Sequence, residues 1–576
     1  MSSPGAATLR AGSVQHVRPR GRATVMLLGL VTLLVVALAV RLSLLIRSSW
    51  LLEGDDALST LMALAILDGD RPIMLKNQTY GAAWEPYAMA ASYLLLGVSR
   101  VAAKLPALLG SVALIGTTWL LAREAAGRAA AWFAAVLMAV PPVYALVLSL
   151  KPWAPYTEVI LLGCLTLTCA LRLAWPRPFQ RDAPWAFTCG VLGGLALWMH
   201  PLAVWYLATA GLVLVARIRG VRWLTIVAAG FAGFAAGGLP IWIFNVQSDG
   251  ATFRFVLGGT QGQTADRLAV LGAWWNNDLP RGAGLWHPWG ASPWLPGAIM
   301  AAAVSLALAG AVFARRRLRP RPLDGLLVFL VLVPAVLVLS GFGGPALNPY
   351  GFDATGRYTP PIWSALAVVL GAGLAAVWRA RRVLALALTV VPLAVNLAGL
   401  VAIDPLQAFQ SPYWDRLPAD NGPLLAALEA ERVQAVWMNH WAGQPVMFDA
   451  RASGQALFAY DWYDVQAGGI DRFPEYLARV EQAERPAFVL VTDEPEPDLE
   501  HTLRLMGVSF VQRRAPPYVV VIPTSRRVHP SEVTSAIDYR YSDFLSSGYS
   551  DVRVSRRGGN SYPFQASRPL PLRKPG

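Results

Sequence analysis

The sequence is poor in charge, in lysine and in cysteine. Only 15% of its 576 residues are charged, whereas 55% are hydrophobic, and the mean hydropathy is +0.44. A soluble protein of this length carries far more charge, because its surface must face water, so a soluble fold is excluded. Apolar runs of about 18 residues or more recur along the chain and predict a polytopic α-helical membrane protein.

Cysteine is nearly absent, and this excludes one class of site. Cys164, Cys169 and Cys189 all lie in apolar runs, where we expect small buried side chains. The sequence contains no CxxC pair and no Cys/His spacing of the kind that binds a metal. A cysteine-based metal or redox site is therefore not expected.

Lysine is scarce, since it occurs only at Lys76, Lys104, Lys151 and Lys574. The formal net charge of +14 comes mainly from arginine, most of which lies in short loops between apolar runs. Arginine in such loops sets the orientation of a membrane protein. The charge therefore indicates a lipid bilayer as partner and argues against nucleic acid.

Eleven apolar segments are predicted to span the membrane. The first follows a basic cytoplasmic N-terminus, residues 1–23, and it is too long for a signal peptide and lacks an A-x-A site, so we expect an uncleaved span. The segments are residues 24–46, 105–122, 128–149, 157–173, 184–199, 201–216, 223–244, 295–314, 324–341, 361–378 and 383–403. Together they predict a transmembrane module over residues 24–403.

A twelfth apolar stretch, residues 87–98, is too short to cross a hydrocarbon core of about 30 Å. If it lies along the surface, the N-terminus and all arginine-rich loops, including RRRLRPR at 315–321, fall on one side of the membrane. This predicts a multi-pass protein of the cytoplasmic (inner) membrane. The N-terminus would be cytoplasmic and the C-terminal region extracytoplasmic.

From residue 404 the composition becomes acidic, and helix-like segments alternate with strand-like segments. VQAVWM, AFVLVTD and PYVVVIP are typical of strands, whereas GPLLAALEAER, FPEYLARVEQAE and PDLEHTLRLMG are typical of helices. We therefore predict an extracytoplasmic α/β domain over residues 404–524. Residues 525–576 are rich in Ser, Arg, Gly and Pro and are predicted to form a disordered basic tail.

The first outer loop, residues 47–104, carries an acidic pair, Asp55 and Asp56, just after the first span. Apolar residues at helical spacing predict a helix over residues 56–67. Acidic residues are favoured in the first turn of a helix, so the pair has a structural explanation as a solvated helix start. Glu85 has a similar explanation, as a surface residue before the next helix.

The segment GDDALSTLMALAILDGDRPI, residues 54–73, also matches a known pattern: an acidic pair, then a helix, then Gly69 before Pro72. It resembles the first outer loop of GT-C fold glycosyltransferases, especially the bacterial family 39 and protein O-mannosyltransferase-like group. WEPYAMAASYLLLG, GLALWMHPLAVWYL and GRYTPPIWSALAVVL resemble later segments of that superfamily. The likeness covers about residues 24–400.

The resemblance implies an inverting glycosyltransferase that moves a sugar from a polyprenyl phosphate carrier to an extracytoplasmic acceptor. The acceptor must lose a proton as it attacks the anomeric carbon, and a carboxylate can take that proton. By the resemblance Asp55 is this base, and Asp56 orients it or helps to bind a metal. Glu85 matches a carboxylate that binds metal in aminoarabinose transferase relatives, so the resemblance allows a divalent metal and no other cofactor.

The leaving phosphate gains charge, so a cation is expected beside it. The resemblance favours Arg357, which precedes Tyr358 at an outer span end, as a ligand of the lipid phosphate. An arginine in that place also fits a side chain that extends toward the lipid headgroups. Lys151, in the second outer turn SLKPWAPYTE, is the alternative cation.

Three further residues complete the predicted substrate-binding set. Tyr156 and Glu158 share the turn with Lys151, and some relatives have a functional acidic residue there, although KPWAPYTE lacks the Asp motif of the family. His200, in WMHPL, is predicted at an outer span end, where a lone histidine equally fits a structural role.

Two other functions fit the same outline. A transporter or flippase of lipid-linked glycans usually has polar residues at mid-membrane and repeated halves, whereas here the polar residues cluster at outer span ends. A non-catalytic membrane scaffold would not need the acidic pair. Glycosyl transfer is the leading function, and the sugar and the acceptor, whether glycan, lipid or protein, stay open.

Overall fold

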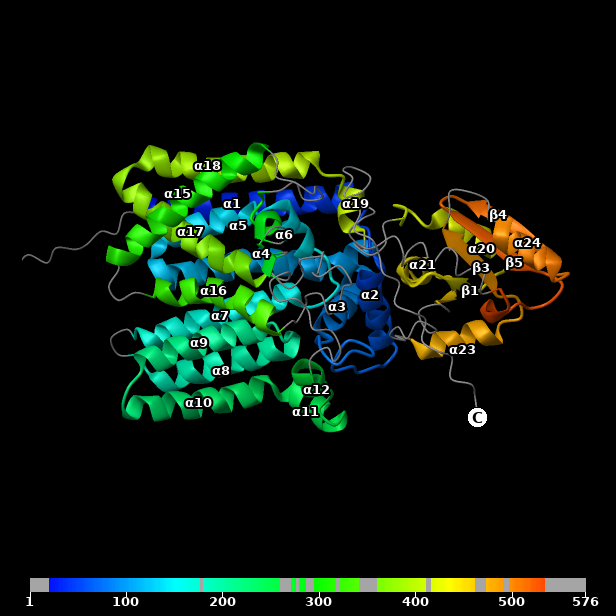
Figure 1. Cartoon of the computed structure of the whole chain (residues 1–576), viewed down its shortest axis with the longest axis horizontal. Helices are drawn as coiled ribbons and strands as arrows, with labels where there is room; N and C mark the ends of the chain where they lie inside the picture. Colours follow the sequence, from blue (N-terminus) through cyan, green and yellow to red (C-terminus); the bar gives the residue numbers. More distant parts are fainter. Residues whose placement is uncertain are drawn as a thin grey trace, which may run out of the picture.

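A computed structural model places the chain in two parts, a large bundle of helices and a smaller domain built on a β-sheet (Figure 1). The structure describes residues 20–176, 180–258, 271–272, 274–275, 279–285, 295–317, 322–340, 360–410, 416–461, 473–491 and 497–533. The predicted fold class, a polytopic α-helical protein with a C-terminal α/β domain, is confirmed.

Each of the eleven predicted spans is helical in the bundle. Its helices are α1 (Arg20–Arg47), α4 (Arg100–Ala126), α5 (Arg128–Ala139), α6 (Val143–Leu148), α7 (Tyr156–Ala174), α8 (Asp182–Met199), α9 (Ala203–Arg217), α10 (Val221–Gly237), α11 (Leu239–Gln247), α12 (Ala251–Gly258), α14 (Leu279–Gly282), α15 (Leu295–Arg317), α16 (Leu323–Ser340), α17 (Pro361–Ala380), α18 (Arg382–Ala402) and α19 (Pro405–Phe409). In the described part of the chain, six helices are long and apolar enough to cross a membrane, or seven if α10 and α11, bent by 61°, form one span. The count of eleven spans stays a prediction.

Small residues let helices of the bundle pack backbone against backbone. A Cβ added at Gly190 of α8 would lie 2.0 Å from the carbonyl oxygen of Gly230. One added at Gly237 of α10 would lie 2.1 Å from the carbonyl oxygen of Val191. Any larger side chain would push α8 and α10 apart, and such small-residue contacts are typical of helices that associate inside a membrane.

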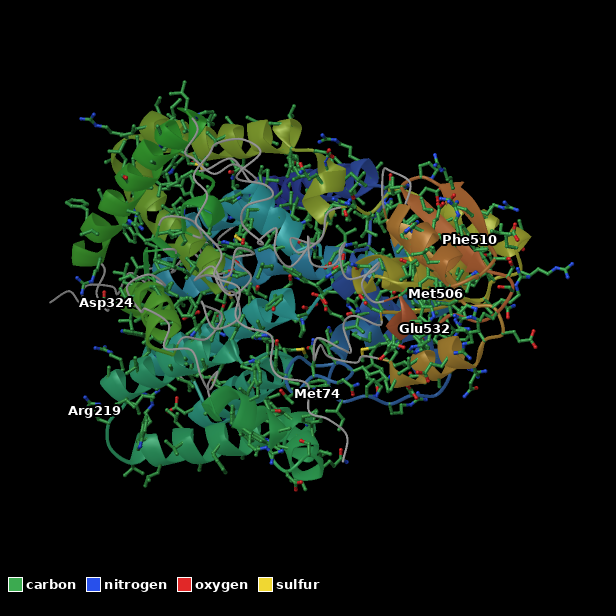
Figure 2. All side chains as sticks on the ribbon, turned by 45° about the vertical axis from the view of Figure 1, so that its right-hand side comes forward. Met74, Arg219, Asp324, Met506, Phe510 and Glu532 are labelled. Carbon is green, nitrogen blue, oxygen red and sulfur yellow. The ribbon has the colours of Figure 1, made fainter. Side chains whose placement is uncertain are left out.

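The bundle has two unlike ends, which we call the loop end and the arginine end. The loop end carries α2 (Gly54–Leu67), α3 (Trp84–Leu96) and the C-terminal domain (Figure 1). The arginine end carries turns between spans, and Figure 2 shows Arg219 and Asp324 there, on the side away from Met74. These two turns lie at the same end of the molecule, as the arginine bias predicts.

Two surface helices form the loop end. α2 begins at Gly54, two residues before the predicted start, so both aspartates lie in its first turn. α3 has 13 residues and therefore measures about 20 Å, which is too short for a span. It packs beside α2 and α4, and its length agrees with a helix that lies along the membrane surface.

The C-terminal domain is a mixed five-stranded sheet in the order β2-β1-β3-β5-β4. Strand β1 (Ala435–Met438) pairs in parallel with β2 (Phe458–Tyr460) and β3 (Ala487–Val491), and β5 (Tyr518–Pro523) pairs antiparallel with β3 and β4 (Phe510–Ala515). Its helices are α20 (Gly422–Ala430), α21 (His440–Ala452), α23 (Pro474–Gln482), α24 (Pro497–Leu505) and the 3₁₀ helix η2 (Pro530–Glu532).

The domain is larger than the sequence predicts. Its strands β2 and β4 and its helix α21 are absent from the prediction. Val528 and Val533 are fully buried in its core, so the predicted boundary at residue 525 is too early and the domain extends at least to Val533. Residues 1–19 and 534–576, which include most of the predicted tail, lie outside the described residues.

Ion pairs and an aromatic contact hold the C-terminal domain against the loop end. Arg100, in the first turn of α4, donates from Nε (2.8 Å) and from Nη2 to the two carboxylate oxygens of Asp449 in α21. Trp441 of α21 lies so close to Gly54 that a Cβ on that glycine would be 2.8 Å from its ring. The first turn of α2 is therefore covered by the C-terminal domain.

Candidate functional site

The first turn of α2 presents its two aspartates in different environments. Glu53 is the N-cap, with an extended backbone (φ −92°, ψ 178°), and Asp55 and Asp56 follow Gly54. Carboxylates are favoured there by the positive end of the helix dipole. Asp55 is half-buried, whereas Asp56 is fully buried. Of the two, only Asp55 is open to an incoming group.

Asp56 is held by a buried lysine. Its Oδ2 accepts a hydrogen bond of 2.6 Å from Nζ of Lys104 on α4, and both side chains are fully buried. Lys104 also donates to the carbonyl oxygen of Leu150 at 3.4 Å, and its ammonium lies 4.8 Å from the centre of the Phe409 ring. The interpretation of Asp56 as a solvated helix start is therefore wrong, because the structure buries it in an ion pair.

A second buried lysine faces Glu53 more loosely. Nζ of Lys151 lies 3.5 Å from Oε1 of Glu53, and it donates to the carbonyl oxygens of Gln410 at 3.1 Å and Phe409 at 3.4 Å. It also lies 4.7 Å from the centre of the Trp153 ring. Neither carboxylate oxygen of Glu53 has a hydrogen-bond partner among the described residues.

Burial raises the pKa of Glu53 to about 8, because the charged form loses its hydration. Lys151 opposes this rise, whereas Asp56 and Asp55 add to it. Burial therefore favours the protonated form of Glu53.

Glu85, in the first turn of α3, and Glu158, in the first turn of α7, lie near one another. Burial raises the pKa of Glu85 well above its ordinary value, Glu158 and Asp56 raise it further, and Lys104 opposes the rise. One oxygen of each glutamate, Oε2, is buried with no hydrogen-bond partner among the described residues. Burial therefore favours the protonated form of Glu85.

The described residues do not form a zinc-type site at Glu85, where the sequence predicts a metal. A zinc site takes three or four protein ligands. In the described part of the chain, no group of three or more His, Cys, Asp and Glu side chains is arranged to hold a metal. Asp56, the other expected ligand, instead gives one oxygen to Lys104.

His200 is fully buried at the junction of α8 and α9. Its Nδ1 accepts a hydrogen bond of 3.2 Å from the backbone N–H of Leu202, which fixes the ring. The ring centre lies 5.0 Å from that of Tyr156 and 5.5 Å from that of Tyr80. These contacts agree with the structural role that the sequence left open for His200.

A small cavity, with room for about one water molecule, lies beside the turn that carries Lys151. Ser149, Trp153, Tyr156, Thr157 and Trp363 are among the residues that line it. Its wall is mostly apolar, and part of it belongs to that turn. Residues 357 and 358, the predicted phosphate ligands Arg357 and Tyr358, lie outside the described residues.

Two members of this site, Glu53 and Lys104, were not predicted from the sequence. Lysine is so scarce in the chain that each lysine was itself a candidate for a functional residue. Each of the three lysines that precede residue 400 forms an ion pair with a carboxylate at the loop end: Lys76 with Glu475, Lys104 with Asp56, and Lys151 with Glu53.

Comparison with known proteins supports this arrangement at the level of the fold. No family model and no curated protein matches the chain. ArnT from Cupriavidus metallidurans in the apo state superposes with a TM-score of 0.59 at 15% sequence identity, over 87% of this chain and 98% of that chain. The structure of the same protein bound to undecaprenyl phosphate superposes with a TM-score of 0.58, at the same identity and coverage. The arabinofuranosyltransferase AftD from Mycobacteria gives 0.50 at 16%, over 86% of this chain and 40% of that chain. The chain thus has the GT-C fold of membrane glycosyltransferases, as its sequence predicts.

Proposed function

We propose that the protein is an inverting glycosyltransferase that moves a sugar from a polyprenyl phosphate carrier to an extracytoplasmic acceptor. One observation carries this proposal: a half-open aspartate, Asp55, lies at the loop end of a GT-C fold beside two buried lysines, Lys104 and Lys151. A structurally similar protein binds undecaprenyl phosphate, and another is an arabinofuranosyltransferase by name.

The proposed step needs a base and a charged group for the leaving phosphate. Asp55 takes the proton of an acceptor hydroxyl or amide as the acceptor atom attacks the anomeric carbon. The bond between that carbon and the phosphate oxygen breaks, and the electron pair leaves with the polyprenyl phosphate. Attack from the side opposite the leaving group inverts the anomeric centre.

Lys151 is the described cation best suited to the leaving phosphate. Its contacts, 3.1 to 3.5 Å long, are looser than the 2.6 Å hydrogen bond that ties Lys104 to Asp56. Lys151 is also buried, and in a buried setting the attraction between an ammonium and a phosphate is strong. Arg357 and Tyr358 are proposed to contact the same phosphate.

Asp56 and Lys104 are proposed to position Asp55. Their ion pair ties the first turn of α2 to α4 and, through the carbonyl of Leu150, to the turn that carries Lys151. Tyr156 and Glu158 are proposed to bind the sugar or the first part of the carrier. No step is assigned to a metal, because the described carboxylates offer no three-ligand set.

We propose that the loop end faces outward from the cytoplasmic membrane and the arginine end faces the cytoplasm. The arginine-bearing turns at one end support this orientation. A cysteine placed at Arg219 should then be inaccessible to an impermeant thiol reagent added to intact cells, and its labelling from outside would reverse the orientation.

The transporter alternative has weaker support. The buried acids and lysines described above gather at the loop end, on α2, α3 and the first turns of α4 and α7, rather than at mid-membrane.

Transfer of a labelled sugar in liposomes would test the proposal directly. The purified protein would be given polyprenyl phosphate sugars of several kinds with an extract of cell-envelope acceptors, and labelled product and released polyprenyl phosphate would be counted. Equal amounts of both are expected. Translocation of intact donor across the liposome, without product, would favour the transporter.

A further inference from the structure

Arg41 of α1 is buried inside the helical bundle, with 1% of its surface exposed. Its guanidinium donates from Nε to Ser111 Oγ at 2.8 Å, from Nη1 to the carbonyl oxygens of Ala37 at 3.0 Å and Ala139 at 3.1 Å, and from Nη2 to those of Ser111 and Met138, both at 3.3 Å. No carboxylate among the described residues pairs with it. A buried arginine is expensive inside a membrane, so its presence needs an explanation.

The contacts of Arg41 lead to the lysines of the proposed site. Ser111 Oγ, which accepts from Arg41, lies 2.7 Å from the Oγ of Ser149. Ser149 begins a segment of three residues, 149–151, and each of the three contacts a residue of α4 or the N-cap of α2. Ser149 contacts Ser111, Leu150 accepts from Lys104, and Lys151 faces Glu53.

Arg41 also holds the other end of the same stretch of chain. Met138 and Ala139 are the last residues of α5, and their carbonyl oxygens would otherwise lack helical partners. The stretch from 138 to 149 is thus fastened to α1 at its start and, through Ser111, at its end. The planar fork of an arginine can reach several acceptors at once, which a lysine cannot do.

We infer that Arg41 is a positioning residue, which fixes the 149–151 segment and thereby the ammonium of Lys151 that faces the carrier phosphate. This role rests on the proposed function of Lys151. Arg41 itself is buried and reaches the segment only through the hydroxyl groups of Ser111 and Ser149, so we do not expect it to touch a substrate.

A purely structural arginine would behave differently from a positioning one. If Arg41 only closes the end of α5, its loss lowers stability and weakens the binding of donor and acceptor to the same extent. If it positions Lys151, its loss weakens the donor that carries the phosphate and leaves the acceptor nearly unchanged. The KM of the donor, compared with the KM of the acceptor, therefore separates the two roles.

The test compares Arg41→Met, Arg41→Lys and Ser111→Ala with wild type in the liposome assay. Displacement of a charge by about 1 Å can cost about 10²-fold, so Arg41→Met should lower kcat/KM for the donor by about that factor. Arg41→Lys should recover little of it, since the charge returns without the fork. Ser111→Ala keeps the four backbone contacts of Arg41 and should raise the donor KM on the order of fivefold, as the loss of one hydrogen bond does.

Two variants control for unspecific effects. Arg47→Met removes the other arginine at the end of α1, which donates to the carbonyls of Leu400 and Ile403, away from the segment. Thr117→Ala removes a hydroxyl of α4 that bonds only within its own helix, to Leu114. Both should leave the ratio of the two KM values unchanged.

Unchanged donor KM in Ser111→Ala, or full rescue by Arg41→Lys, would overturn the inference, even if Arg41→Met fails to fold. Affinity for undecaprenyl phosphate alone, measured without transfer, separates this result from a failure of the proposed function. If wild type binds the lipid but transfers no sugar, the proposed function is refuted. The affinities of the variants for the lipid then still show whether Arg41 positions Lys151. Wild type that transfers, with variants of equal donor affinity, refutes Arg41 alone.

Discussion

The two ends of the bundle differ in whether they hold buried ion pairs. At the arginine end, Arg222 pairs with Asp182 and Arg315 with Asp324, and these side chains keep between 17% and 42% of their surface exposed. At the loop end, the pairs Asp56–Lys104 and Glu53–Lys151 keep at most 2%. An exposed pair contributes about 0–1 kcal/mol, whereas a buried pair must first be dehydrated at a cost of several kcal/mol.

This difference indicates what each end is for. Exposed pairs with arginine can orient the chain in a membrane without demanding exact geometry. Buried pairs with lysine contribute no obvious stability, since apolar residues would fill the same space as well or better. Among the described residues such pairs occur only at the loop end, and we expect the protein to use them for chemistry.

Asp55→Asn should have the largest effect on transfer. The amide keeps the shape and can still lie in the first turn of a helix, but it cannot accept the proton, so transfer should fall by about 10²–10⁴-fold. The protein should remain folded and in the membrane. Asp70→Asn, at an exposed acid in the same loop, is the matched control, and full activity of Asp55→Asn would return the residue to its role as a helix start.

Lys104→Met should have the largest effect on stability. It leaves the carboxylate of Asp56 buried without its cation, which costs about 3–5 kcal/mol. The melting temperature of the purified protein in detergent measures this loss. The double variant Asp56→Asn/Lys104→Met removes both charges and should recover most of it. If Lys104→Met alone is as stable as wild type, Asp56 does not depend on Lys104 to compensate its buried charge.

Lys151→Met should weaken donor use more than acceptor use. Loss of one hydrogen bond from a charged group costs about 1.5–3 kcal/mol, so the donor KM should rise by about 10- to 10²-fold. Lys76→Met, which breaks the more exposed pair with Glu475, should leave both KM values unchanged. If Lys151→Met raises both equally, the lysine supports the fold and not the phosphate.

Glu53→Gln should change how stability depends on pH. The folded protein holds a proton on Glu53 up to a pKa of about 8, whereas the unfolded chain releases it near 4.5, so this group makes stability fall as pH rises between those values. The slope is at most about 1.4 kcal/mol per pH unit. Melting temperatures at pH 5 and pH 8 should therefore differ less in Glu53→Gln than in wild type. Glu484→Gln, at an exposed glutamate, should follow wild type, and parallel curves for Glu53→Gln would refute the raised pKa.

Arg222→Ala should have the smallest effect. It removes the exposed pair with Asp182 at the arginine end, which is worth about 1 kcal/mol at most. Melting temperature and transfer rate should both stay close to wild type. A loss as large as that of Lys104→Met would abolish the distinction between the two ends.

The sequence was sufficient to predict elements with strong local signals. Long apolar runs predicted the long helices of the bundle, and apolar residues at helical spacing after the acidic pair predicted α2. Helix α21 was missed because Gly443 and Pro445 interrupt its pattern. Strand β4, FVQRRA, was missed because it is half polar and lies at the edge of the sheet, where only its last residue is buried.

The partners in the site could not be predicted because they lie far apart in the chain. Lys104 reaches Asp56 across 48 positions, and Lys151 reaches the carbonyl of Gln410 across 259. Local periodicity carries no information about such pairs. The same holds for the metal predicted at Glu85, which stays a prediction, since the position of Lys104 decides whether Asp56 is available as a ligand.

The contact between Trp441 and Gly54 also sets an order in time. The chain emerges from the ribosome at roughly 5–20 residues per second, so α21 is made roughly 20–80 seconds after the first turn of α2. Until then the acidic pair has neither the wall that Trp441 provides nor the carbonyls of Phe409 and Gln410 beside Lys151. A nascent chain therefore carries the acidic pair long before the surroundings of that pair are assembled, and it gains them only after residues 405–452 have been made.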